Sequence, residues 1–136
     1  SPAHITIHRP FEWKESKEGE LLKAVTEFEI TKPFKVELRN FNSFDKRVIY
    51  IDVLLSNELN KLYSEFRSHI RQSLGITNEW NNSYGFTPHV TVAFRDLRKH
   101  QFQTVFDEIS KTDFNKSFEV SKISLLKLNE KWEIIN

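Results

Sequence analysis

The order and spacing of the predicted secondary structure repeat once along this chain of 136 residues, and this repeat restricts the fold most. Each unit has an alternating segment, a helical pattern and two further strand patterns. His4 lies 30 positions before Phe34, and His89 lies 29 positions before Phe118. Two units are too few for a solenoid, so we expect a pseudo-symmetric pair of lobes. The predicted strands span 4–7, 34–41 and 48–53 in the first unit, and 89–94, 118–128 and 132–135 in the second.

No segment rich in Pro, Gly or Ser separates the two units. We therefore expect one domain over 1–136, with lobe-forming halves of roughly 1–47 and 48–136. The second histidine strand follows a strand and a helix, whereas the first follows nothing. If the halves are alike, a further strand and helix belong before Ser1, and this sequence lacks them.

Apolar residues at helical spacing predict helices over 18–29, 56–74 and 100–111. Ser56 is a typical N-cap for the second of these helices, and Gly75 is a typical end. Residues 76–87 show no periodic pattern, which predicts a loop.

Composition is that of an ordinary soluble domain. Hydrophobic residues make up 38% of the chain and aromatic residues 13%, enough for a sizeable core. The net charge of +1 does not favour duplex DNA as a partner, and no run of about 18 apolar residues predicts a membrane span. The absence of Cys excludes disulfides and thiolate chemistry, and it agrees with the cytoplasmic location that we expect.

Both units contain the pattern histidine, aliphatic, threonine, aliphatic, at 4–7 and at 89–92. Residues i and i+2 of a strand share a face and lie about 6.5–7 Å apart. His4 therefore shares a face with Thr6, and His89 shares one with Thr91. The aliphatic positions point the other way and are expected to pack on the helices. A pseudo-dyad between the lobes would place the two polar faces around one groove.

Two imidazoles and two hydroxyls around a groove suit the cleavage of a phosphodiester. One histidine removes a proton from the attacking oxygen and the other protonates the leaving oxygen, because histidine titrates near pH 6.5. The hydroxyls of Thr6 and Thr91 would donate hydrogen bonds to the phosphate oxygens, where charge accumulates. Neither a glycine-rich phosphate loop nor a carboxylate cluster at metal-ligand spacing is present, so we expect no metal and no cofactor.

The two motifs, together with the stretch FTPHVTVAFR around the second one, resemble those of the two-histidine (2H) phosphoesterase superfamily, which includes the 2′-5′ RNA ligase and RNA 2′,3′-cyclic phosphodiesterase proteins. The resemblance implies an α+β, bilobal, pseudo-two-fold fold with two antiparallel-rich sheets and outer helices around a central cleft. It also implies metal-independent cleavage of 2′,3′-cyclic or 2′-5′-linked phosphates in an RNA end or a small nucleotide. His4 and His89 would be the general acid and base, in an order that the sequence leaves open. We expect a monomer by default.

Three other interpretations stay open. Both histidines could be hydrogen-bonded core residues, or the same cleft could bind RNA or a nucleotide without turning it over. A metal site built from His4, His8 and His89 would lack a carboxylate.

Further cleft residues are suggested by position alone. They compete with plain roles on the surface or in packing, as do the aromatic residues Trp13 and Trp80; His69 and His100 are predicted to be surface residues. The candidates for the cleft are His8, Arg95, Phe11, Tyr84 and Phe86.

Overall fold

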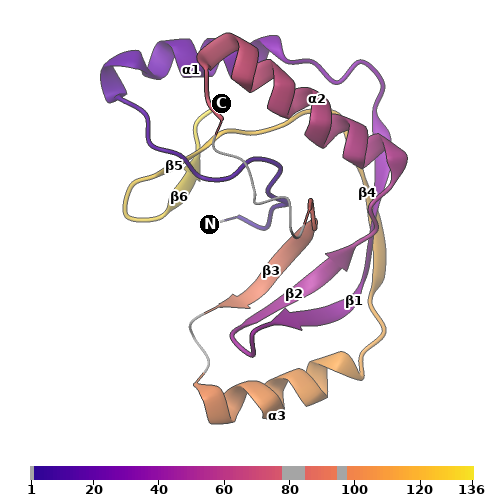
Figure 1. The fold of residues 1–136 in the computed structure, drawn as a ribbon. Coiled ribbons are helices and arrows are strands. Elements are labelled where there is room, and N and C mark those ends of the chain that lie inside the picture. The colour runs from indigo at the N-terminus through magenta and orange to yellow at the C-terminus, as the bar shows by residue number, and fades with distance from the viewer. Residues whose placement is uncertain (1, 78–84, 95–97) are drawn as a thin grey trace.

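The computed structural model describes residues 2–77, 85–94 and 98–136. These residues form three α-helices and six strands, and a 3-10 turn, η1, leads directly into the first helix, α1. Figure 1 shows how the helices and strands are arranged. The elements are η1 (Glu15–Lys17), α1 (Glu18–Glu27), β1 (Phe34–Phe44), β2 (Val48–Val53), α2 (Asn57–Leu74), β3 (His89–Phe94), α3 (Lys99–Ser110), β4 (Asn115–Val120), β5 (Leu126–Leu128) and β6 (Trp132–Ile134).

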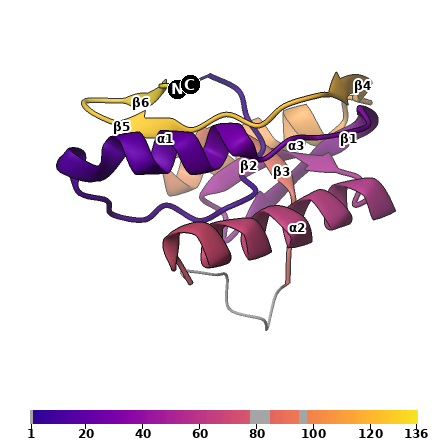
Figure 2. The same ribbon diagram turned by 90° about the horizontal axis from the view of Figure 1, so that it is seen from above.

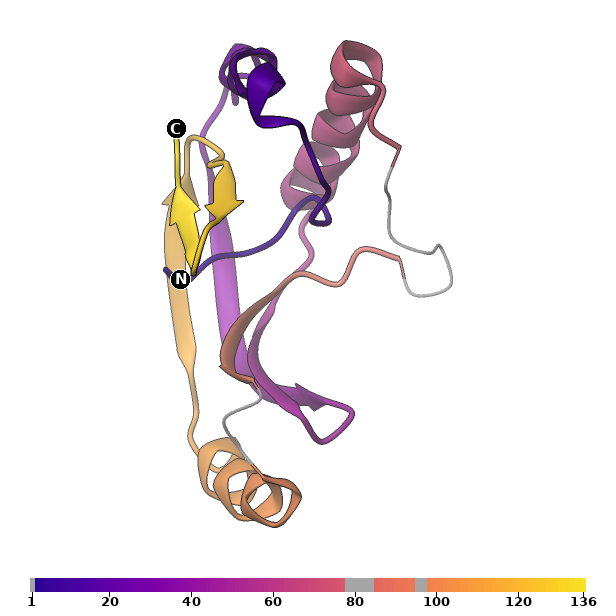
Figure 3. The ribbon, with the colours of Figure 1, turned by 90° about the vertical axis from the view of Figure 1, so that its left-hand side faces the viewer.

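Two antiparallel sheets form the framework of the protein. The larger sheet has the strand order β3-β2-β1-β4, and β5 and β6 form a separate hairpin. Helices α1 and α2 lie side by side at one end of the molecule and α3 lies at the other (Figures 1 and 3). The predicted fold class, α+β with two antiparallel sheets and outer helices, is confirmed.

Two clusters of buried side chains form much of the core, and α2 contributes to both. One cluster joins α1 to α2, and the other joins α2 to β1 and β2. Figure 2 shows α1 and α2 running next to each other, with the β5–β6 hairpin close to α1. The apolar stripe predicted for α2 is confirmed, because the members that it supplies to the clusters are all buried. The helix cluster contains Leu21, Val25, Phe66 and Ile70, and the sheet cluster contains Val36, Val53, Leu59 and Leu62.

The predicted strand over 4–7 is wrong, because residues 2–6 have no regular secondary structure and a bend follows at 7–8. The alternation itself is real: Ile5 and Ile7 pack against the sheet cluster, while His4 is exposed. Alternating side chains decide which residues face the core, but a strand also needs a hydrogen-bonding neighbour.

Other boundaries differ less. The strand predicted over 118–128 is two strands, β4 and β5, with irregular backbone between them. The larger sheet takes β1 from the first predicted half of the chain and its other three strands from the second. Where two lobes divide along the chain stays a prediction. Within the described ranges, no helix combines the length and the apolar character needed to cross a membrane.

Ser56 caps the N-terminus of α2, as predicted. Its Oγ accepts a hydrogen bond from the backbone N–H of Leu59 at 3.1 Å. We expect Ser56→Ala to lower the free energy of unfolding by about 0.5–2 kcal/mol, because one N–H group of the first turn loses its partner. Urea unfolding measures this loss. Ser64→Ala, at an exposed position within the same helix, is the control and should cost nothing; an equal loss in both variants would contradict the cap.

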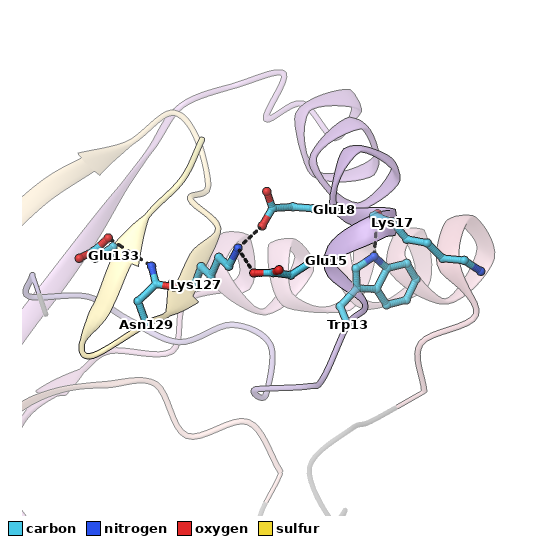
Figure 4. A network of polar contacts seen from close by, with 7 residues as sticks. All are labelled: Trp13, Glu15, Lys17, Glu18, Lys127, Asn129 and Glu133. Atoms are coloured by element: carbon cyan, nitrogen blue, oxygen red, sulfur yellow. Dashed lines mark hydrogen bonds and ion pairs between the residues drawn. The ribbon is translucent and has the colours of Figure 1, made fainter.

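A polar network attaches the β5–β6 hairpin to the start of α1 (Figure 4). The Nζ of Lys127 donates hydrogen bonds to Glu18 at 2.8 Å and to Glu15 at 3.2 Å. Nearby, the indole N–H of Trp13 donates to the carbonyl of Lys17 at 2.8 Å. One ammonium group thus joins the last part of the chain to the first helical turns.

The Lys127 ion pairs should stabilise the protein only while the ammonium is charged. Its bonds to Glu18 and, second, to Glu15 raise the pKa of Lys127 above the ordinary value of 10.5. A raised pKa in the folded state gives stability that is complete below 10.5 and is lost as the pH rises through the folded value. We expect Lys127→Met to be less stable than the wild type near neutral pH, and this difference to shrink well above pH 10.5.

Urea unfolding of both proteins at the two pH values measures this difference. Lys131→Met, in the turn of the same hairpin, is the control and should show a smaller effect. A deficit in Lys127→Met that stays constant with pH would show that the ion pairs are not its origin.

Candidate functional site

The second histidine motif lies on β3, at an edge of the larger sheet. In the register of β2 and β3, His89 is opposite Asp52 and Thr91 is opposite Tyr50. Residues directly opposite each other in an antiparallel pair share a face, so these four side chains lie on one face of the sheet. Val90 points the other way and packs against the sheet cluster. The strand predicted over 89–94 is confirmed with the same bounds.

The His89 imidazole is held by one hydrogen bond and two aromatic rings. Its Nδ1 lies 2.9 Å from the carbonyl oxygen of Thr87. The rings of Phe44 and Tyr50 meet it edge to face, at centroid distances of 5.2 Å and 5.3 Å. A carbonyl oxygen only accepts hydrogen bonds, so Nδ1 carries the proton, and in the neutral ring the lone pair is on Nε2.

His4 makes the same kind of bond from irregular backbone. Its Nδ1 lies 2.7 Å from the carbonyl oxygen of Pro2, which is again two residues before the histidine. Both imidazoles are therefore fixed as the same tautomer by a local backbone bond. Among the described residues, no hydrogen bond engages the Nε2 of either ring, and no direct contact joins the two rings. In both motifs Nε2 is the atom left to exchange a proton.

The aliphatic residues of both motifs enter the same core. Ile5, Ile7 and Val90 all pack against the sheet cluster. The N-terminal segment runs between the α1–α2 pair and β3, as Figures 1 and 3 both show. Aliphatic residues of two motifs that lie far apart in the sequence thus pack against one buried cluster.

Val92 departs from the prediction that it packs inward, because its side chain is 50% exposed. The register explains this difference. Ile49 is opposite Ala93 and Tyr50 is opposite Thr91, so Val92 is an extra residue in a β-bulge. A bulge breaks the alternation of faces along a strand.

The two threonines differ in their surroundings. Thr91 is exposed on β3, beside His89 on the same face, and Thr6 is half-buried in the N-terminal segment. Their role as phosphate donors stays a prediction.

The side chain of His8 packs toward the core, so His8 does not have the role of a surface loop residue. Its ring meets Phe11 at 5.4 Å and Phe66 at 6.2 Å, both edge to face. Its Nδ1 lies 2.9 Å from the carbonyl of Arg9, and its Nε2 is buried without a hydrogen-bond partner. Its orientation into the aromatic cluster gives the proposed metal site of His4, His8 and His89 no support. In the described ranges, no group of three or more His, Asp or Glu side chains is placed to hold a metal ion.

The other cleft candidates either pack against neighbouring side chains or lie outside the described residues. Phe11 packs against the helix cluster beside Trp13, and Phe86 stacks on Tyr63 at 4.2 Å. These contacts favour the packing roles that competed with base stacking. The predictions for Arg95, Tyr84 and Trp80 lie outside the described residues.

Sequence reasoning missed two residues beside His89, Phe44 and Tyr50. Tyr50 is 4% exposed, and burial first, then the carboxylate of Asp52, raises the pKa of its phenol. The phenol therefore stays neutral at neutral pH. No sequence signal marks these residues, because their place beside His89 depends on the register of three strands.

His69 was predicted to be a surface residue, and this is wrong. Its Nε2 lies 2.6 Å from the carbonyl of Ala24, and its ring packs at 5.4 Å from Phe28, so it links α2 to α1. A signal was present in this case. His69 lies three positions after Phe66 and directly before Ile70, at the border of the apolar stripe.

Comparisons with known proteins show the family and the fold of this chain. A protein of Geobacillus sp. (strain WCH70) named a "putative phosphoesterase" is 27% identical over 128 residues, which cover 92% of this chain and 69% of that protein. The crystal structure of TT0787 of Thermus thermophilus has the same fold, with a TM-score of 0.70 and 16% identity, over 98% of this chain and 75% of that one. The model of the 2′-5′ RNA ligase superfamily matches residues 1–132, nearly the whole chain and both histidine motifs, and the chain therefore belongs to this superfamily.

Proposed function

We propose that this protein is a phosphoesterase that hydrolyses a 2′,3′-cyclic or 2′-5′-linked phosphodiester without a metal ion. The observation that carries the proposal is the matching bond of the two histidines, Nδ1 to the carbonyl two residues earlier, at 2.7 Å and 2.9 Å. This bond fixes the tautomer and leaves Nε2 for proton transfer. Membership of the superfamily and the name of the Geobacillus relative support the same class of reaction.

In the proposed reaction, water attacks the phosphorus atom and one bond from phosphorus to a ribose oxygen breaks. The Nε2 of one neutral histidine accepts the proton that water loses. The other histidine, protonated at Nε2, gives its proton to the departing oxygen. The hydroxyls of Thr6 and Thr91 hold the non-bridging oxygens. Exchange with solvent then restores both protonation states.

The test uses the wild-type protein in EDTA with three probes. They are a nucleoside 2′,3′-cyclic phosphate, a 2′-5′-linked dinucleotide and the matched 3′-5′-linked dinucleotide. We expect one of the first two to be cleaved and the third to be left intact, with products separated by chromatography. Binding without product would favour a binding module instead. Activity that needs added Mg²⁺ would contradict the metal-independent mechanism.

A further inference from the structure

We propose that the stacked pair Phe44 and Tyr50 positions the imidazole of His89 for proton transfer. The proposal rests on the proposed function, because it assigns His89 a part in that reaction. Both residues act here through His89, and neither is assigned a contact with the substrate.

The three rings form one closed group. Phe44 stacks on Tyr50 with centroids 4.2 Å apart and an interplanar angle of 23°. Both rings then meet His89 edge to face, Phe44 at 77° and Tyr50 at 62°. With the bond from Nδ1 to Thr87, the imidazole is restrained on several sides. A 180° flip of the imidazole would break that bond, and a rotation of its plane would disturb both edge contacts.

The backbone explains why this group forms. Phe44 ends β1, and the turn after it has positive φ at Asp45 (49°) and Lys46 (53°). The backbone N–H of Arg47 closes the turn by donating to the carbonyl of Phe44 at 3.0 Å. Tyr50 lies on β2, opposite Asn42, so Phe44 is its diagonal neighbour on the same face.

The two rings of the stacked pair differ in burial. Tyr50 is 4% exposed and Phe44 is 36% exposed. The inner ring is thus fixed by the sheet, and the outer ring shields His89 at the surface. His4 differs, because within the described ranges no aromatic ring packs on it. We therefore assign the aromatic support to one of the two histidines only.

Phe44→Leu is the main test variant, because its partial exposure lets the protein fold without the ring. A misplaced catalytic group costs up to about 100-fold in rate, so we expect kcat to fall by about 10- to 100-fold with KM nearly unchanged. Phe44→Tyr keeps the ring and should retain kcat within about threefold. Phe118→Leu is the matched control, because Phe118 is 43% exposed on β4 at the opposite edge of the same sheet. It should leave kcat unchanged.

A second readout does not depend on turnover. Proton–nitrogen correlation spectra of the ¹⁵N-labelled histidine rings report the tautomer of His89 directly. We expect one tautomer, with the proton on Nδ1, in the wild type and in Phe44→Tyr, and a mixture in Phe44→Leu. Urea unfolding of each variant verifies that it is folded under these conditions.

These readouts separate the two proposals. If the wild type cleaves no probe, the proposed function fails, while the spectra still test the positioning. If Phe44→Leu keeps both kcat and the single tautomer, the positioning role is overturned. A rise in KM with unchanged kcat would also overturn it, because Phe44 would then bind substrate and not orient His89.

Discussion

If the proposed function is correct, replacing either His4 or His89 with alanine should lower turnover of the cyclic or 2′-5′-linked substrate by about 10²–10⁴-fold. Each variant removes one of the two proton transfers, and the remaining imidazole cannot supply both. In the proposed reaction the two histidines act as a unit, so the double variant should be little slower than the slower single variant. Steady-state kinetics on the substrate that the wild type cleaves best measure these effects.

The matched control is His100→Ala, because His100 is an exposed histidine near the start of α3. It should keep full turnover. Circular dichroism and urea unfolding show whether the variants at His4 and His89 are still folded. Wild-type kcat in either of these two variants would contradict the two-histidine mechanism.

Leu59→Ala should damage the core severely and lower the free energy of unfolding by about 2–5 kcal/mol. Leu59 is 2% exposed in the sheet cluster, against which Ile5, Ile7 and Val90 pack. Losing its side chain leaves a cavity under both histidine motifs. Domains of this kind have about 5–15 kcal/mol of stability in all, so the loss is a large fraction.

Urea unfolding measures the loss. Leu55→Ala makes the same substitution at a side chain that is 49% exposed, a few residues earlier in the chain. It should stay within about 0.5 kcal/mol of the wild type. A loss below about 1 kcal/mol in Leu59→Ala would show that the cluster closes around the missing atoms and that the motifs do not depend on it.

The sequence was sufficient to predict elements whose pattern is local. The stripe on α2 includes Leu59, Phe66 and Ile70, and all three are buried. The bounds of β2 and β3 also agree with the predictions, because each is a short apolar run with a clear turn or loop signal beside it.

Features that depend on pairing between distant segments could not be predicted. The alternation of residues 4–7 correctly places Ile5 and Ile7 toward the core. It could not show that this segment does not pair with a neighbouring strand among the described residues. For the same reason, the bulge at Val92 and the rings around His89 were missed. A shift of register by one residue reverses every face, and only the paired strands reveal it.

The bulge at Val92 should also make association between copies of this protein less favourable. β3 is an edge strand of its sheet, and another chain can pair with the free edge of such a strand and start aggregation. The extra residue in the bulge twists β3 and interrupts the regular row of amide groups along this strand. The strand that carries His89 is therefore expected to be a poor starting point for aggregation, although it lies at the edge of its sheet.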